Sequence, residues 1–170
     1  MKPLSDKWFI APIVLLLVHF LYRLIDQSQM MFQFALDFNN DVSSYMAQLH
    51  FLDVCGFHQA CPYWYNGFTT FTFSPPGWYF FTYPLHLLFS DVKIATYVSL
   101  ILMFLLGLFL LIKLGKTANF SLTKRIAFFA LFFGNASAIG NFIRLGRVNE
   151  LLGWILFIPL FFLFYHYRDK

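Results

Sequence analysis

Hydrophobic and polar positions divide the chain into long apolar runs separated by polar segments. The apolar runs cover residues 8–25, 94–112, 126–142 and 151–167. Each is close to the length of about 20 residues that a helix needs to cross the hydrocarbon core of a bilayer. We therefore predict an all-α, polytopic membrane protein, a single membrane domain with four membrane-spanning helices over these ranges.

The polar segment 26–93 is long, and its pattern predicts two further helices. In residues 41–53, apolar side chains recur on one face at helical spacing, which predicts an amphipathic helix on the membrane surface. These apolar positions are Val42, Tyr45, Met46, Leu49 and Leu52. Residues 77–89 form an apolar run of about 20 Å as a helix, shorter than a span. We expect this run to be partly embedded without crossing, with a short span as the alternative; turn-forming residues predict a loop over 54–74.

Positive charges favour one orientation in the membrane. With a cytoplasmic N-terminus, most lysines and arginines fall inside, as the positive-inside rule requires. They are Lys2, Lys7, Lys113, Lys116, Lys124, Arg125, Arg168 and Lys170. We therefore expect a multi-pass protein of the cell membrane with both termini cytoplasmic and residues 26–93 and 143–150 extracytoplasmic.

Composition agrees with this class of protein. The chain is 59% hydrophobic and 12% charged, whereas soluble domains carry about 25% charged residues. Its net charge of +4 is spread between apolar runs rather than gathered on one basic face. The lipid bilayer is thus the expected partner, and nucleic acid is not.

Acidic and basic residues in the two outer segments are the candidate chemistry. Asp41 and Glu150 fall on the same side, and they converge if the helices pack as a bundle. Two carboxylates can hold Mg²⁺ or Mn²⁺, or one of them can act as a general base. Arg144 and Arg147 could bind the phosphate of a lipid carrier. The alternative is structural: Asp41 caps a helix and the arginines anchor a helix end among lipid headgroups.

Two cysteines and several histidines are candidate metal ligands. Cys55, His58 and Cys61 lie close together, but three ligands without a fourth make a poor structural zinc site. A disulfide between the cysteines, or two free thiols, is the better interpretation. His19 lies inside the first apolar run, and we expect a buried, neutral histidine with a hydrogen-bonding neighbour rather than a ligand.

Short motifs in the outer segments resemble those of known membrane enzymes. The segment Asn-Asp-Val-Ser-Ser-Tyr, residues 40–45, resembles the first outer loop of the GT-C superfamily of polytopic glycosyltransferases. These enzymes take sugars from polyprenyl-phosphate carriers. In the catalytic subunits of oligosaccharyltransferases, an aspartate matching Asp41 binds the divalent cation and the acceptor. The resemblance thus implies a catalytic and metal-binding role for Asp41.

Other motifs look more like a family described as 6-pyruvoyl-tetrahydropterin-synthase-related membrane proteins. They are Pro-Tyr-Trp-Tyr-Asn-Gly at residues 62–67, Ser-Pro-Pro-Gly-Trp-Tyr at 74–79 and Gly-Arg-Val-Asn-Glu at 146–150. The resemblance implies that Trp64, Pro75 and Pro76 line the substrate site. The chain departs from the oligosaccharyltransferase pattern, because Glu150 stands alone where those enzymes carry an Asp-x-Asp pair.

The resemblance leads to one functional expectation and two alternatives. GT-C enzymes are several times longer than this chain, so we expect the N-terminal membrane module of a glycosyltransferase that uses a polyprenyl-phosphate-linked sugar. The alternative is a non-catalytic membrane subunit that binds lipid carriers or assembles with a second membrane chain. A small transporter or channel ranks last, because few ionisable residues lie inside the spans.

Overall fold

The computed structural model describes residues 7–33, 41–63, 67–72 and 74–168. Helices dominate the fold, and one two-stranded antiparallel hairpin pairs Ala60 with Thr69 and Cys61 with Phe68. In chain order the elements are α1 (Lys7–Gln33), α2 (Val42–Cys55), β1 (Ala60–Cys61), β2 (Phe68–Thr69), α3 (Gly77–Phe89), α4 (Val92–Thr117), α5 (Leu122–Phe133), α6 (Ala136–Ala138), the π-helix η1 (Ile139–Arg144) and α7 (Val148–Tyr167).

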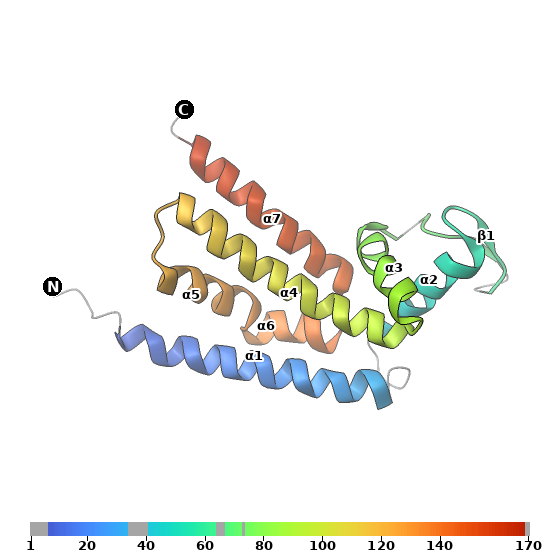
Figure 1. Ribbon diagram of the computed structural model, residues 1–170, viewed down its shortest axis with the longest axis horizontal. Coiled ribbons are helices and arrows are strands. Elements are labelled where there is room, and N and C mark those ends of the chain that lie inside the picture. The colour runs from blue at the N-terminus through green and yellow to red at the C-terminus, as the bar shows by residue number, and fades with distance from the viewer. Residues whose placement is uncertain (1–6, 34–40, 64–66, 73, 169–170) are drawn as a thin grey trace.

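The long helices run together along the long axis of the molecule, and the shorter elements gather at one end. In Figure 1, α1, α4 and α7 follow that axis, while α2, α3 and the hairpin lie at the right-hand end. The start of α1 and the end of α7 both lie at the opposite end, together with the α4–α5 connection. We call the end that carries α2 and α3 the distal end.

Three helices are long and apolar enough to cross a membrane. They are α1 over Ile10–Gln29, α4 over Val92–Thr117 and α7 over Val148–Tyr167. This suggests a membrane protein and agrees with three of the four predicted spans. Each of these helices begins or ends several residues outside the predicted range, because polar turns at a helix end are still helical.

The predicted span over 126–142 is not one straight helix. α5 ends at Phe133, and the chain bends by 50° before continuing through α6 and η1. The break is capped within the chain. The Asn135 side chain accepts a hydrogen bond from the Ala138 amide (3.0 Å) and donates to the Leu131 carbonyl (2.7 Å). The pair counts as a fourth span only if the bent unit crosses as a whole.

Phenylalanines join the long helices into one core. The Phe20 ring of α1 meets the Phe104 ring of α4 at 4.8 Å and the Phe129 ring of α5 at 5.6 Å, both edge to face. Phe104 in turn meets Phe133, the last residue of α5. Edge-to-face packing suits the ring quadrupole. These contacts hold α1 against α4 and α5 along one side only.

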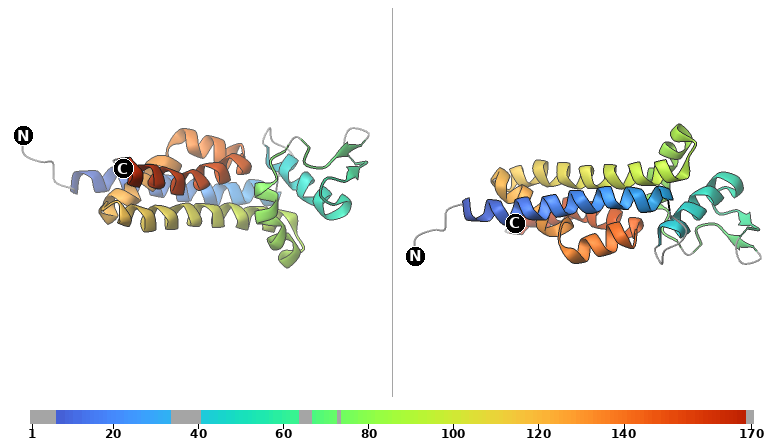
Figure 2. Two further views of the ribbon diagram at one scale, coloured as in Figure 1. Left: turned by 90° about the horizontal axis from the view of Figure 1, so that it is seen from above. Right: turned by 90° about the horizontal axis from the view of Figure 1, so that it is seen from below.

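The short helix α3 lies across the end of the bundle rather than along it (Figure 2). Its range, Gly77–Phe89, equals the predicted run, and it is too short to count among the helices that could cross a membrane. Pro76 precedes it, and the Pro76 carbonyl accepts the Phe80 amide hydrogen at 3.1 Å. Proline suits such a start, since its fixed φ is preorganised for a helix and its missing donor costs nothing there.

Residues 41–74 contain a helix and a loop close to their predicted ranges. α2 buries Val42, Met46, Leu49 and Leu52, four of the five positions on its predicted apolar face. Cys55 and Cys61 form a disulfide, with their Cα atoms 5.4 Å apart. The disulfide excludes free thiols and uses both of the sulfur ligands that a metal would need. The predicted loop also contains the small β1–β2 hairpin.

Candidate functional site at the distal end

The starts of α2 and α7 meet through the backbone. The Asp41 amide donates to the Leu145 carbonyl at 2.7 Å, and Gly146 lies directly against the Val42 side chain. Gly146 has a φ of +67°, a left-handed conformation that glycine adopts without steric cost. Asp41 and the segment that leads into α7 are therefore brought together by main-chain contacts.

Arg147 lies beside both candidate carboxylates. Its Nε is 3.8 Å from Asp41 Oδ2, and its Nη1 is 3.7 Å from Glu150 Oε2. The three side chains are 56%, 46% and 43% exposed for Asp41, Arg147 and Glu150, respectively. Exposed ion pairs of this length stabilise a fold by only about 0–1 kcal/mol. The backbone contacts therefore position these charges, and the carboxylates remain accessible to a ligand.

A π-helical turn shapes the approach to Arg147. The Leu145 amide donates to the Gly140 carbonyl at 2.9 Å, and the Arg147 amide donates to the Asn141 carbonyl at 3.1 Å. Such wide turns occur most often as short insertions near functional sites. Arg144 lies at the end of this turn, exposed, and it forms no ion pair with another residue in the described ranges. Its guanidinium is therefore available to an anion.

A layer of buried aromatic residues lies behind the charged residues. Tyr45 of α2 stacks at a tilt on Trp78 (5.7 Å) and Tyr79 (6.1 Å), the first residues of α3 after Gly77. Trp78 and Tyr79 are fully buried. The Trp78 indole donates to Ser99 of α4 at 3.1 Å, so α3 is tied to the bundle by a buried hydrogen bond.

Asn149 links the aromatic layer to α7. Its side-chain oxygen accepts the Trp78 amide hydrogen at 3.3 Å, and its amide group lies near the Tyr45 and Tyr79 hydroxyls. Burial raises the pKa of Tyr45, and the negative charge of Asp41 raises it further. Burial also raises the pKa of Tyr79. Both tyrosines are thus neutral hydrogen-bonding groups at physiological pH.

The Tyr79 hydroxyl is buried without a well-formed hydrogen bond to any residue in the described part of the chain. Asn149 and Ser74 are close enough to lower its pKa slightly, but neither has good hydrogen-bonding geometry. A buried polar atom of this kind is satisfied by water or by a ligand. The Tyr79 hydroxyl therefore has hydrogen-bonding capacity that the described residues leave unused.

The structure brings some of the predicted site residues together but not all of them. Asp41, Glu150 and Arg147 come together, as expected from their positions in the two outer segments. Pro75 is exposed and Pro76 is half-buried, and both lead into the part of α3 that packs on α7. Trp64 lies outside the described residues. The expected cap role of Asp41 is not found: it precedes α2, but its side chain makes no capping hydrogen bond.

Sequence reasoning missed the aromatic layer. Trp78, Tyr79 and Asn149 belong to the motifs at 74–79 and 146–150, but no role was assigned to them. One signal was present: a tryptophan and a tyrosine directly after a predicted helix start would lie at the end of the bundle. The pairing of Asp53 with His86 (3.9 Å) and Tyr83 (3.3 Å), between α2 and α3, could not be found from spacing.

A divalent cation fits these residues poorly. A guanidinium already lies within 4 Å of both carboxylates, at the position a cation between them would need. In the described ranges, no group of three or more His, Cys, Asp or Glu side chains could hold a metal ion. The positive charge at this site comes from Arg147.

The fold and the site define a helical protein whose apolar helices carry a charged and aromatic cluster at one end. No protein-family model, curated protein or solved structure matches the sequence.

Proposed function

We propose that this chain is the membrane module of a glycosyltransferase of the GT-C type, which takes a sugar from a polyprenyl-phosphate carrier. One observation carries the proposal: Asp41 and Glu150, accessible and far apart in sequence, lie beside the same arginine at the end of a bundle of apolar helices. The motif resemblance in the outer segments supports the same assignment.

The distal end faces the extracytoplasmic side in this proposal, and the membrane is the cell membrane. Two features support the orientation. Four cations lie around the α4–α5 connection, at the end where α1 starts and α7 ends (Figure 1); they are Lys113, Lys116, Lys124 and Arg125. Cations at this end suit the cytoplasmic side. The Cys55–Cys61 disulfide at the other end suits an oxidising compartment.

Each step of the proposed sugar transfer is assigned to a charged side chain. The acceptor's hydroxyl or amide attacks the anomeric carbon of the sugar while the bond from that carbon to the carrier's phosphate oxygen breaks. Asp41 takes the proton released by the acceptor, and Glu150 helps to position the acceptor. The carrier leaves as polyprenyl phosphate, and the guanidinium groups of Arg144 and Arg147 stabilise its negative charge. Each step uses a side chain that is exposed at the distal end.

The test measures sugar transfer in membrane vesicles that contain the full chain and a labelled polyprenyl-phosphate sugar. Loss of a general base lowers a rate by about 10²–10⁴-fold, so Asp41→Asn is expected to reduce transfer by at least about 100-fold. Asp53→Asn is the matched control, since Asp53 is an exposed carboxylate on the same helix but at its other end. Transfer that survives Asp41→Asn, or that is no higher than in vesicles without the chain, would refute the proposal.

One observation favours a second candidate, a non-catalytic subunit that binds the lipid carrier. The guanidinium of Arg147 lies within 4 Å of both carboxylates, so each of them already has an ion-pair partner within the chain. In this case a photoreactive polyprenyl phosphate labels the chain without sugar transfer, and Arg144→Gln reduces the labelling. Labelling without transfer selects the subunit, and both together select the enzyme.

A further inference from the structure

One histidine lies on the outer surface of an apolar helix. His19 is near the middle of the α1 segment that is long enough to cross a membrane, and it is exposed. The expectation of a buried, hydrogen-bonded histidine is therefore wrong. Phe20, the next residue, turns into the core instead, and so do Leu17 and Leu24 on the same side. His19 makes no hydrogen bond with another residue of the described ranges.

An imidazole in this position needs a partner. If α1 crosses the bilayer, as the proposed function assumes, His19 would face hydrocarbon, where an unsatisfied polar group is costly. Ionisable residues in membrane helices almost always face protein or water and pair with another polar group. In the described part of this chain nothing supplies that group, so His19 needs a polar partner from outside these residues.

α1 is also the least enclosed of the three long helices. Only 11% of its apolar window is buried, against 44% for α4 and 28% for α7. In Figure 1 it forms one edge of the molecule, with its far side uncovered. This is the geometry expected of a helix that packs against a second molecule.

The exposed positions near His19 follow the spacing of a helix–helix seam. They are Leu15 (69% exposed), His19, Tyr22 (60% exposed) and Gln29, together with the half-buried Asp26. In chain order these five positions are separated by four, three, four and three residues. This is the alternation that keeps one stripe of a helix facing a partner in left-handed packing. Together these five positions form what we call the α1 seam.

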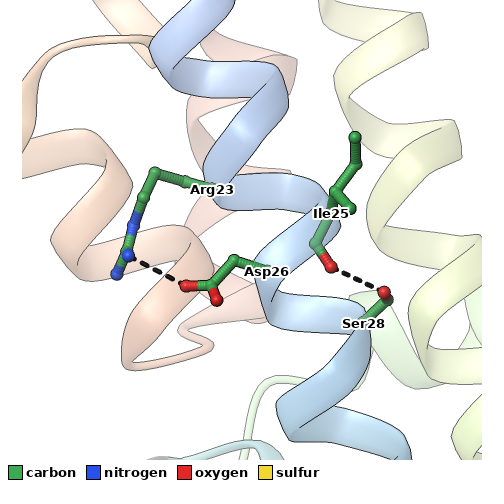
Figure 3. A network of polar contacts seen from close by, with 4 residues as sticks. All are labelled: Arg23, Ile25, Asp26 and Ser28. Carbon is green, nitrogen blue, oxygen red and sulfur yellow. Dashed lines mark hydrogen bonds and ion pairs between the residues drawn. The ribbon is translucent and has the colours of Figure 1, made fainter.

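The charge on the seam is already neutralised. Asp26 pairs with Arg23 of the same helix at 2.9 Å, as Figure 3 shows, and the Ser28 hydroxyl bonds to the Ile25 carbonyl at 2.6 Å. Two copies of Asp26 can therefore approach each other with their charge balanced within each helix. Near the middle of the seam, His19 offers a partner a hydrogen-bonding group between Leu15 and Tyr22.

We propose that the α1 seam is the interface of a parallel dimer with a second copy of this chain. A two-fold axis along the membrane normal brings each seam residue opposite its own copy. Histidine is self-complementary in that position, because a neutral imidazole has one donor and one acceptor nitrogen. One His19 donates a hydrogen bond to the acceptor nitrogen of the other, so each imidazole gains one polar partner. The dimer rests on α1 crossing the membrane but not on sugar transfer.

The test is disulfide cross-linking of the full chain in native membranes. The native cysteines are already paired, so a single new cysteine reports alone. His19→Cys, Leu15→Cys and Tyr22→Cys are expected to give a covalent dimer under mild oxidation. Leu21→Cys is the control, since Leu21 is equally exposed on α1 but lies off the seam. Equal cross-linking at Leu21, or none at the seam positions, would overturn the dimer.

A second measurement separates a lost contact from misfolding. Self-association in membranes, followed by energy transfer between labelled copies, is expected to weaken by about 3- to 20-fold in His19→Leu, the range for polar contacts between membrane helices. His19→Gln keeps a donor and an acceptor and is expected to retain most of the association. If both variants associate like the parent chain, or if His19 cross-links only to a different protein, the proposal fails. Transfer activity is irrelevant to either readout.

Discussion

Gly146 shows how a single residue determines the geometry of the site. Its φ of +67° is in the left-handed region, and the position of a Cβ would coincide with the Val42 side chain. Any other residue strains the backbone and pushes α2 away from α7. The contact between the Asp41 amide and the Leu145 carbonyl depends on this close approach. The glycine thus keeps Asp41 within reach of Arg147.

We therefore expect Gly146→Ala to destabilise the protein. A left-handed alanine costs about 1 kcal/mol and forced overpacking about 1–3 kcal/mol more. The measurement is thermal unfolding in mild detergent. Gly153→Ala is the control, because a Cβ there meets nothing within 4 Å, and it should leave the midpoint unchanged or slightly higher. If both variants lowered the unfolding midpoint equally, the close contact of Gly146 with Val42 would not be what stabilises the protein.

For individual residues, the sequence predicts where the charged side chains gather but not which residues most side chains contact. Asp41 and Glu150 converge, as expected from their positions in the two outer segments, and Arg147 lies beside both of them. His19 was misjudged, because composition says that a histidine lies within a span but not which side of the helix it occupies. The partners of Tyr45 and Asn149 depend on tertiary packing, which short motifs do not encode.

Among the elements, the broken unit of α5, α6 and η1 departs most from expectation. Residues 126–142 are mostly apolar, and hydrophobic periodicity does not register a break. Gly134, at the break, allows a close approach: a Cβ would lie 2.6 Å from the Ala130 carbonyl oxygen and 3.3 Å from that of Leu16. The ranges of α2 and α3, by contrast, were predicted well, because proline and a clear apolar face mark them.

The bend predicts a specific sensitivity at Asn135. Its side chain satisfies the Ala138 amide and the Leu131 and Phe132 carbonyls at the break. Loss of a helix cap costs about 0.5–2 kcal/mol, so Asn135→Ala is expected to lower the free energy of unfolding by about that amount. Denaturant titration in detergent measures it. Ser137→Ala, an exposed position two residues on, should be nearly neutral; an equal effect there would argue against the cap.

For the whole molecule, the arrangement of the ends predicts a topology. The start of α1, the end of α7 and the α4–α5 connection lie at one end (Figure 1), and the disulfide-bonded segment lies at the other. A reporter enzyme that works only in the cytoplasm should be active when it is fused after residue 168 or inserted at Asn119, and inactive when it is inserted at His58. A reporter that works only outside the cytoplasm should give the opposite result. If the insertions at Asn119 and His58 report the same side of the membrane, the proposed orientation is ruled out.

The contact between Asp41 and Leu145 also determines when, during synthesis, the charged cluster can form. More than half of the chain separates these two residues, so the ribosome delivers the first long before the second. Until Leu145 emerges, the start of α2 has no main-chain partner there, and Asp41 carries a charge that Arg147 has yet to meet. A nascent chain arrested before α7 thus has its aspartate but no finished cluster. Translation itself therefore delays the contact between Asp41 and Arg147 until the start of α7 has been made.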